Sequence, residues 1–567
     1  MKKYKYIILL LAFLLNKLSG QPVDVILSTQ LEVDNFSFTQ PPIIGSLTIM
    51  GTDIINLNGL DSVKYINNSL NVIGTNITNL NGLNNLKFIH DNLVIRANNL
   101  LEEISALDFV EFSNFPFPGV IIIEDNPLLL TISTLNKVKY LYSNVSIKNN
   151  ASLTEINGFN GLDSIGEYFP PFCSAGIINI DNNPTLQSIA GFKNLKRIGA
   201  WISIANNHNL TQISGFNSLN FVGCDLRIEE DSTLTAMTGF NTLDTIGGNF
   251  YIWNTGLANF DTCFVNLQYI GSHLWIDNNK KLSSLKGLSN LAIISKSLIV
   301  SLNPSLVSIS GFGGLHYVDG ISLYANHKLD SISNGFNNLE IIGNKGIDIS
   351  INDSLKYINC FNSVDSILGS LSISNNPSLK TILGLQDLKH IEEDLFLGTT
   401  SFIFHSPLED ITGFDHPISI GGDLTIKNTS LSDCAVVCVC DYLLSPSGVS
   451  TIQSNQSGCN TTAQVVDACM VSVQEKPVPS LLIFSIMPNP VSSDIILRLN
   501  TDVSEGALFK FYNLLGNCVH DVKIKRRYLK GEEIQTSAIG FQNGLYICSL
   551  FSSEELYNQS CPFIVQK

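Results

Sequence analysis

Charged side chains are scarce in this chain. Only 14% of its 567 residues are charged, and Lys+Arg (33) are outnumbered by Asp+Glu (49), which leaves a formal net charge of −16. A field of this sign repels a phosphate backbone, so nucleic acid is not an expected partner. The acidic residues are also too dilute to form a disordered acidic tail.

Catalytic and nucleotide-binding motifs are missing as well. The chain contains no HExxH, GxSxG, GxxxxGK[ST] or CxxC sequence, so the commonest signatures of zinc hydrolases, serine hydrolases, P-loop proteins and dithiol enzymes are absent. We therefore expect neither a metal nor a cofactor, and no enzyme activity. Beyond the N-terminus no stretch is long and apolar enough to predict a transmembrane helix.

The N-terminus has the pattern of a cleaved export signal. Basic residues (Lys2, Lys3 and Lys5) precede a nine-residue apolar stretch, Ile7–Leu15, which is too short to span a bilayer. Small residues at 19–20 predict cleavage before Gln21, so residues 1–20 form the predicted signal peptide. No cysteine follows the cleavage point, so a lipoprotein anchor is not expected. Export to an oxidising compartment permits disulfides.

One phrase of about 24 residues dominates the rest of the chain. Its core is apolar-x-apolar, as in SLSISNNPSLKTILGLQDLKHIEED at 370–394. The first apolar residues of its sixteen copies are Leu47, Leu70, Leu93, Ile121, Val145, Ile178, Ile202, Leu226, Phe250, Leu274, Leu298, Ile321, Ile347, Leu371, Leu395 and Leu424. A fixed period of this length predicts a solenoid, in which each copy forms one turn.

Each copy alternates like a strand. Leu371 and Ile373 are expected to face inward and Ser372 and Ser374 outward, and Asn, Gly, Ser and β-branched residues favour strands and turns over helices. Sixteen stacked turns would make a rod of about 75 Å, taking about 4.8 Å per strand. Three longer steps contain FPFPG (115–119), EYFPPFCSA (167–175) and SFIFHSP (401–407), which we expect to form loops.

The repeat resembles the receptor L-domain, a relative of the leucine-rich repeats. The shared pattern is [LI]-x-I-x-x-N-x-x-L-x-x-I-x-G-[FL]-x-x-L-x-x-I, and it covers roughly residues 46–433. The resemblance implies a mainly β fold, a right-handed parallel β-solenoid. We expect two columns, each made of residues at equivalent positions of successive repeats, to be structural. The Asn column would bond the backbone at each corner: Asn150, Asn183, Asn207, Asn279, Asn303, Asn326 and Asn376. The Phe column would stack in the core: Phe159, Phe192, Phe216, Phe240, Phe312, Phe336 and Phe414.

A solenoid needs caps, because its terminal turns expose core and unpaired strand edge. Residues 21–45 are the predicted N-terminal cap and residues 434–469 a cysteine-rich C-terminal cap. That second segment holds five cysteines: Cys434, Cys438, Cys440, Cys459 and Cys469. Disulfides are favoured over zinc because CVC does not provide paired CxxC knuckles. Five is odd, so at least one thiol is expected to be free or to pair elsewhere.

After a Pro-bearing linker (470–484) the repeat stops and the residue pattern changes. Residues 485–567 run from a PNP turn through strand–turn–strand FKFYNLLGNCV (509–519) to GLYICSL and a terminal PFIVQK. They resemble the type A C-terminal sorting domain of the type IX secretion system, which implies a small antiparallel β-sandwich read by the outer-membrane machinery. An ordinary immunoglobulin-like adhesion module is the alternative. The motif residues are Pro488, Asn489, Pro490, Gly516, Gly544, Leu545, Tyr546 and Lys567.

The alternation of inward and outward residues along each strand, called parity here, singles out one part of the solenoid. Most turns place Ser, Asn, Thr or Asp outward, but turns seven to ten place all three tryptophans there. The candidate ligand-binding residues are Trp201, Arg227, Tyr251, Trp253, His273, Trp275, Asp277 and, two turns further on, Tyr324. Clustered exposed aromatics beside charges favour recognition of a glycan or protein. Packing across neighbouring strands, or an error in the assumed register, are the alternatives.

Two carboxylates leave an enzymatic alternative open. Glu229 and Asp277 share a predicted column, two turns and about 9.6 Å apart by strand spacing, which is compatible with an inverting glycosidase pair. A purely structural surface protein is the other alternative. We expect a secreted or cell-surface binding protein that presents one solenoid face to an extracellular glycan or protein.

Overall fold

The computed structural model describes residues 21–39, 43–112, 119–166, 173, 175–333, 335–400, 405–475, 484–487, 491–500, 502–513, 517–537, 539–551 and 559–566. The predicted signal peptide lies outside these residues, as do most of the three inserted segments. The chain divides into two compact units, residues 1–468 and 469–567.

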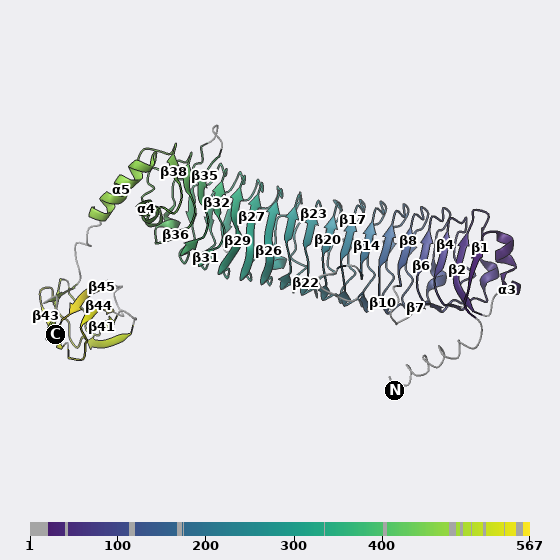
Figure 1. Cartoon of the computed structure of the whole chain (residues 1–567), viewed down its shortest axis with the longest axis horizontal. Helices are drawn as coiled ribbons and strands as arrows, with labels where there is room; N and C mark the ends of the chain where they lie inside the picture. The colour runs from purple at the N-terminus through teal and green to yellow at the C-terminus, as the bar shows by residue number, and fades with distance from the viewer. Residues whose placement is uncertain are drawn as a thin grey trace. The chain divides into compact units, whose positions relative to one another are not determined.

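The first unit is a parallel β-solenoid of about seventeen turns (Figure 1). One strand from each turn joins a continuous parallel sheet, called the main face here. Its strands are β1 (Val23–Leu27), β2 (Ile44–Met50), β4 (Leu70–Ile73), β6 (Leu93–Arg96), β8 (Ile121–Glu124), β11 (Val145–Lys148), β14 (Ile178–Asp181), β17 (Ile202–Ala205), β20 (Leu226–Glu229), β23 (Phe250–Trp253), β25 (Leu274–Asp277), β26 (Ile293–Ser301), β27 (Tyr317–Tyr324), β29 (Ile341–Ser350), β32 (Leu371–Ser374), β35 (Leu395–Gly398), β37 (Leu424–Lys427) and β38 (Ser450–Gln453).

The register of the main face is the predicted one. All sixteen apolar residues that begin the repeats pair with one another in sequence, from Leu47 with Leu70 to Leu395 with Leu424. Along each strand, buried residues alternate with outward ones, as in Leu371 and Ile373 against Ser372. Each predicted cap adds one further strand, β1 at the front and β38 at the back.

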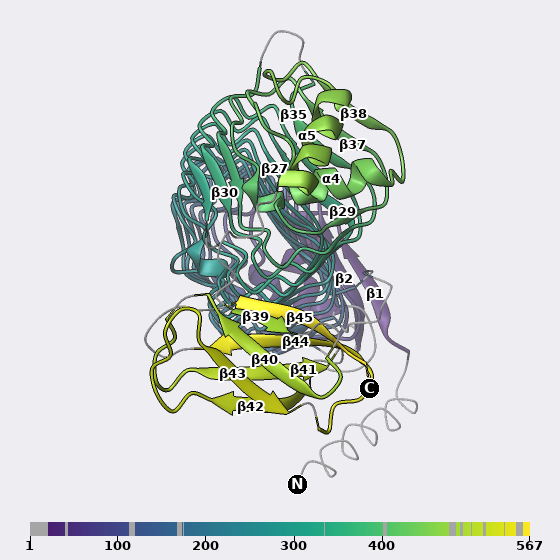
Figure 2. The same ribbon diagram turned by 90° about the vertical axis from the view of Figure 1, so that its left-hand side faces the viewer.

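Two other sides complete each turn, and Figure 2 views the coil along its length. The second side carries β9 (Thr131–Ile132), β12 (Glu155–Ile156), β15 (Ser188–Ile189), β18 (Gln212–Ile213), β21 (Ala236–Met237), β28 (Ser331–Ser333), β30 (Tyr357–Asn359) and β33 (Thr381–Leu383), with short 3₁₀ turns at η2 (Asn58–Leu60), η3 (Ser105–Leu107), η4 (Lys286–Leu288) and η5 (Thr412–Phe414). The third side carries β3 (Tyr65–Ile66), β5 (Phe88–Ile89), β7 (Glu111–Phe112), β10 (Tyr140–Leu141), β13 (Ser164–Ile165), β16 (Arg197–Ile198), β19 (Phe221–Val222), β22 (Thr245–Ile246), β24 (Tyr269–Ile270), β31 (Ser366–Ile367), β34 (His390–Ile391) and β36 (Ser419–Ile420). The long strands β26, β27 and β29 run from the third side onto the main face without a break.

The core is aliphatic with a stack of phenylalanines. Successive rings lie 4.8–5.7 Å apart from Phe159 through Phe264, with interplanar angles of 2–19°. A second stack joins Phe312, Phe336 and Phe361. The predicted Phe column is therefore confirmed as core, and Phe414 is fully buried as well.

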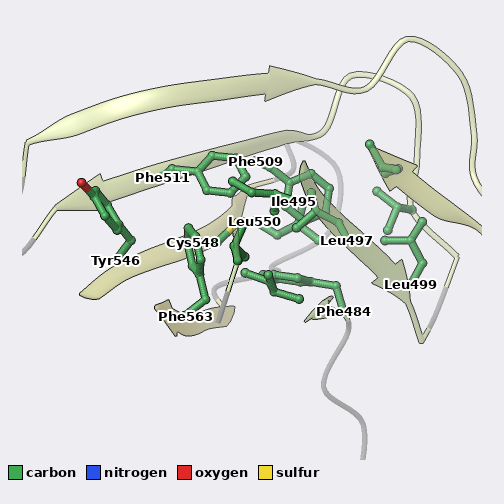
Figure 3. Close-up of a cluster of buried hydrophobic side chains, with 14 of the residues drawn as sticks. Phe484, Ile495, Leu497, Leu499, Phe509, Phe511, Tyr546, Cys548, Leu550 and Phe563 are labelled. Atoms are coloured by element: carbon green, nitrogen blue, oxygen red, sulfur yellow. The ribbon is translucent and has the colours of Figure 1, made fainter. Parts of the chain in front are cut away.

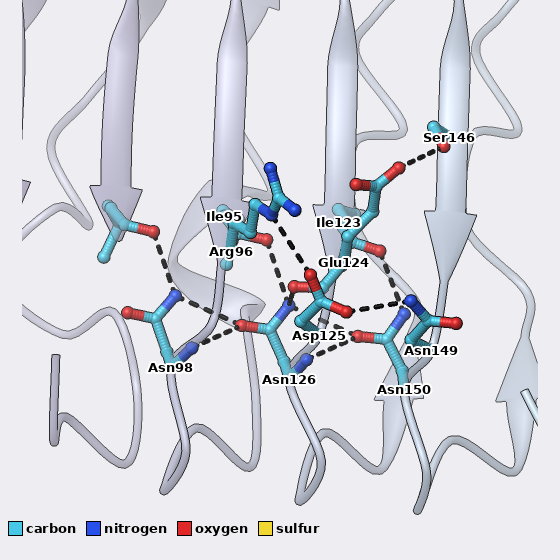
Figure 4. Close-up of polar contacts among 11 residues, drawn as sticks. Ile95, Arg96, Asn98, Ile123, Glu124, Asp125, Asn126, Ser146, Asn149 and Asn150 are labelled. Carbon is cyan, nitrogen blue, oxygen red and sulfur yellow. Dashed lines mark hydrogen bonds and ion pairs between the residues drawn. The ribbon is translucent and has the colours of Figure 1, made fainter. Parts of the chain in front are cut away.

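The predicted Asn column forms a buried ladder of hydrogen bonds (Figure 4). The Asn126 amide donates to the carbonyls of Ile95 (3.0 Å) and Glu124 (2.9 Å), and its oxygen accepts the backbone N–H of Asn98 at 3.1 Å. Because each amide satisfies backbone groups that water cannot reach, the ladder offsets the cost of burying the corners that carry an asparagine. Its asparagines are Asn98, Asn126, Asn150, Asn183, Asn207, Asn279, Asn303, Asn326, Asn352 and Asn376.

The residue just after most main-face strands takes a left-handed conformation. Asn is common there, as at Asn278 (φ 55°), but turn thirteen has Ile351 at φ 57°. A β-branched residue in this region costs about 1–2 kcal/mol relative to residues that tolerate it.

We therefore expect Ile351→Asn to raise the free energy of unfolding by about 1 kcal/mol. The matched control is Asn278→Ile, which places the same side chain at the same corner and should lower it by a similar amount. Denaturant unfolding of both variants measures the difference. A loss of stability in Ile351→Asn would contradict the strain argument.

Helices close both ends of the coil, although the sequence analysis predicted none. At the front, α2 (Gln30–Asp34) and α3 (Phe36–Thr39) bury Val33 and Phe36. At the back, α4 (Val437–Leu444) packs against β36 and η5, and α5 (Thr462–Glu475) follows β38 in the chain. These segments lie outside the repeat, so its strand-favouring composition does not extend to them.

Disulfides hold the back cap together. Cys434 is bonded to Cys459, and Cys440 and Cys469 are also disulfide-bonded. Cys438 is the odd cysteine of the five and remains a buried thiol on α4. Burial raises the pKa of the Cys438 thiol to about 12, so it stays protonated and unreactive.

The second unit consists of two small antiparallel sheets. One contains β39 (Phe484–Met487), β40 (Asp494–Leu499) and β43 (Glu533–Ser537), and the other β41 (Leu508–Asn513), β42 (Cys518–Lys523), β44 (Gly544–Phe551) and β45 (Gln559–Val565). Figure 3 shows side chains from both sheets meeting in one cluster. Ile495, Leu497 and Leu499 are buried there, as their alternation predicted.

Candidate ligand-binding ridge

Apart from Tyr324 on β27, the aromatic and charged candidates lie in three rows across β17, β20, β23 and β25. The entry row precedes each strand, the middle row lies between the two inward residues, and the end row follows the second inward residue. None of the candidate side chains is buried, because each occupies an outward position. Together the rows are called the ridge.

The middle row is a continuous stack. The Arg227 guanidinium lies 4.7 Å over the Tyr251 ring, and Tyr251 stacks on Trp275 with ring centroids 4.7 Å apart. Trp275 stacks in turn on His273, which directly precedes β25, at 5.0 Å and 16°. These rings cover one another's faces, so packing across the sheet accounts for the middle row.

Before β20, β23 and β25 the entry row consists of hydrogen-bond acceptors. Asp225 accepts the N–H of Asn249 (2.8 Å), and Asn249 accepts the N–H of His273 (3.2 Å). His273 accepts the N–H of Ser297 through Nδ1 (3.2 Å), which places its proton on Nε2. Burial, with Lys296 nearby, lowers the pKa of His273 and keeps it neutral. His273 is thus part of the scaffold.

The end row differs from the other two. Its members in register are Glu229, Trp253 and Asp277 on β20, β23 and β25. Trp253 is 39% exposed, and among the described residues its indole has no stacking partner. An unstacked, exposed indole between two carboxylates is free to contact a ligand.

Trp201 and Tyr324 lie apart from this end row. Trp201 is half-buried in the entry row of β17, at the opposite end of the strand from the end row. Tyr324 is in the end row, but three turns beyond Trp253, or about 14 Å by strand spacing. It is 40% exposed, so it could extend a contact that begins at Trp253.

The sequence analysis missed an apolar stripe on the third side. Tyr269, Ile293, Tyr317 and Ile341 lie on four adjacent turns in register, and each is 36–42% exposed. The signal was present, because each residue directly precedes an inward isoleucine or valine of the third strand. Attention to the main face alone left it out.

The disulfide between Cys173 and Cys224 was also missed. Its Cα atoms lie 6.2 Å apart, and it joins the segment before β14 to the residue before Asp225 of the entry row. The bond crosses from turn six to turn eight, and so braces the solenoid beside the ridge. Pairing could not be deduced because these cysteines are 51 residues apart.

The sorting-domain motif is described only in part. Gly544, Leu545 and Tyr546 lie in β44, and the buried Tyr546 hydroxyl accepts the N–H of Gln542 at 3.0 Å. Pro488, Asn489, Pro490, Gly516 and Lys567 lie outside the described residues. Cys548 faces the core of this unit.

Within the described part of the chain, no group of three or more His, Cys, Asp or Glu side chains is arranged to hold a metal ion. No helix there is long and apolar enough to cross a membrane.

Comparison with known proteins supports both halves of this description. Residues 42–137 match the Receptor L domain family, and residues 485–565 match the secretion system C-terminal sorting domain family. No curated protein matches the chain. The sorting domain indicates secretion across the outer membrane to the cell surface or beyond, and implies engagement with the secretion machinery. The chain is a parallel β-solenoid protein with a receptor L-domain at its N-terminal end and a type IX C-terminal sorting domain.

Proposed function

We propose that this protein is an extracellular binding protein whose ridge recognises a glycan or protein, with Trp253 as its central contact. The observation that supports this is the exposed Trp253 indole beside the self-stacked middle row. Tryptophan is the residue most enriched among binding hot spots, since it buries a large rigid surface at small entropic cost.

A scaffolding role suits the rest of the solenoid. The Asn ladder, the Phe stack and the disulfides hold the main-face strands in register, so outward side chains occupy fixed positions before a ligand arrives. Pre-organisation of this kind lowers the entropic cost of binding.

The carbohydrate-active enzyme is a weaker candidate. In the strand register the Trp253 indole stands between Glu229 and Asp277, and the Ser301 hydroxyl donates to Asp277 at 2.7 Å. An acid–base pair would need to hold the scissile bond between the two carboxylates, where the indole stands. The arrangement therefore favours a contact surface and not a catalytic pair.

We expect Trp253→Ala to weaken binding about 30-fold, the equivalent of ~2 kcal/mol for a hot spot. The measurement uses the chain from Gln21 to Lys567 on immobilised glycans and extracellular-matrix proteins. Tyr317→Ala is the matched control, because it removes an aromatic of similar exposure from the third side.

Three outcomes would count against the proposal. Equal loss in both variants would move the binding surface away from the ridge. Binding by the wild type that survives Trp253→Ala would do the same, and a wild type that binds nothing on the panel would favour the purely structural role.

A further inference from the structure

The charges around Trp253 indicate what kind of ligand fits it. We propose that the ridge recognises a basic protein segment, with a Lys or Arg side chain over the Trp253 indole and paired with Glu229 and Asp277. This inference rests on the proposed function and adds the chemistry of the partner.

The two carboxylates stand on either side of the indole. Glu229 and Asp277 pair in register with Trp253, so each backbone position lies about 4.8 Å from that of the tryptophan. Glu230 follows at the next position, where it accepts a hydrogen bond from the Asn254 amide. An aromatic face flanked by negative charge attracts a cation both by the ring quadrupole and by Coulomb attraction.

Among the described residues, the protein offsets this charge only in part. Arg227 is the basic residue of the ridge, and its Nη2 lies 2.7 Å from Asp225 of the entry row while its guanidinium covers Tyr251. Lys280 and Lys281 come after the buried corner residue Asn279, beyond the end of the strand. Counting Asp225, Arg227, Glu229 and Asp277, the ridge has an excess of negative charge.

Burial raises the pKa of Glu229, although Arg227 lowers it in part. A carboxylate that has lost water without a full counter-charge is stabilised by an incoming cation. The ligand would therefore supply what Glu229 lacks. An acidic glycan would be repelled by these carboxylates, and the net charge of −16 would slow its approach.

A protein segment fits this surface better than a small cation. Small quaternary ammonium ions are held in cages of several aromatic faces. Tyr251 and Trp275 are stacked on each other, so among the described residues of β20, β23 and β25 the end row offers a ligand a single open indole face, that of Trp253. The end row continues through Ser301 to the exposed Tyr324. An extended segment lying along the coil could contact Trp253 and Tyr324 together.

The test uses fluorescence anisotropy with the chain from Gln21 to Lys567. The probes are three labelled peptides of equal length: alternating Arg-Ser, Gln-Ser and Glu-Ser. We expect the Arg-Ser peptide to bind at least tenfold more tightly than the other two, and its affinity to fall as salt rises from 50 to 200 mM.

The variants locate the effect. Glu229→Gln/Asp277→Asn should weaken Arg-Ser binding at least tenfold, and Trp253→Ala should do likewise. The control Asp244→Asn/Glu340→Gln removes two exposed carboxylates from the third side and should change affinity less than twofold. Circular dichroism checks that each variant is folded.

Three results would overturn the inference: no preference for the Arg-Ser peptide, equal loss in the control, or full binding by Glu229→Gln/Asp277→Asn. If a panel ligand is lost in Trp253→Ala but unaffected by Glu229→Gln/Asp277→Asn, the ridge binds a neutral partner. In that case the inference fails while the proposed function stands.

Discussion

Asn303→Ala is expected to lower the free energy of unfolding of the solenoid by about 4 kcal/mol. The Asn303 amide donates to the carbonyls of Ile276 (2.9 Å) and Ser301 (2.8 Å), and its oxygen accepts the backbone N–H of Asn279 at 3.0 Å. Alanine would leave these backbone groups without a partner in a site that is fully buried. Each such group costs about 1–3 kcal/mol.

The control is Asn338→Ala, which removes an exposed side chain that donates to Gly313 at 2.8 Å. Because water can replace that bond, the expected loss is below about 1 kcal/mol. Denaturant unfolding of the two variants measures the contrast. Similar losses in both would mean that the ladder contributes no more than an ordinary surface hydrogen bond.

Asp231→Asn is expected to stabilise the protein, and more strongly as pH rises. Asp231 occupies an Asn position of the ladder, where Oδ1 accepts the N–H of Asn207 at 2.7 Å. Its Oδ2 is buried without a hydrogen-bond partner. At the neighbouring position the Asn207 amide donates to Ile180 and Ala205, so Oδ2 lies where the ladder needs a donor.

The sign of the pH dependence follows from protonation. Burial raises the pKa of Asp231 to about 8, against an ordinary value of 3.8. The folded state therefore favours the protonated acid. This contribution to stability is complete below about pH 4 and is lost as pH rises towards 8, which amounts to about 4 kcal/mol by pH 7 at ~1.36 kcal/mol per unit.

The amide of Asp231→Asn supplies the donor at every pH. The difference in unfolding free energy between variant and wild type should be small at pH 4 and increase steadily to pH 8. Denaturant titrations at pH 4, 6 and 8 give this difference directly, and other titrating groups cancel in it. A difference that does not change with pH would show that Asp231 is not protonated by folding.

The repeat could be recognised in the sequence because every turn must bury apolar residues at the same positions. Leu371 and Ile373 must face inward for the same reason as their counterparts one turn away, so a single alignment gave the register of the whole main face. The Asn and Phe columns followed by the same logic. Nothing in the sequence repeats across α4 or α5, and their helices were accordingly missed.

The ridge was only partly predictable. Parity placed Tyr251, Trp253 and Trp275 outward, which the structure shows. Parity could not tell which ring would stack on a neighbour, because that depends on the residue beside it one turn away. Tyr251 has Trp275 and Arg227 as neighbours and is covered, whereas Trp253 has Glu229 and Asp277 and stays open. The pairing of Cys173 with Cys224 depends in the same way on spatial neighbours that sequence order hides.

The most direct test of a ligand-binding ridge is photo-crosslinking on whole cells. A photoreactive tryptophan analogue that keeps the indole would replace Trp253 in the full chain, and in a second version Tyr357, which is 40% exposed on the second side. The account predicts a discrete adduct from position 253 that is absent from position 357. Equal labelling from both positions, or none from position 253, would contradict it.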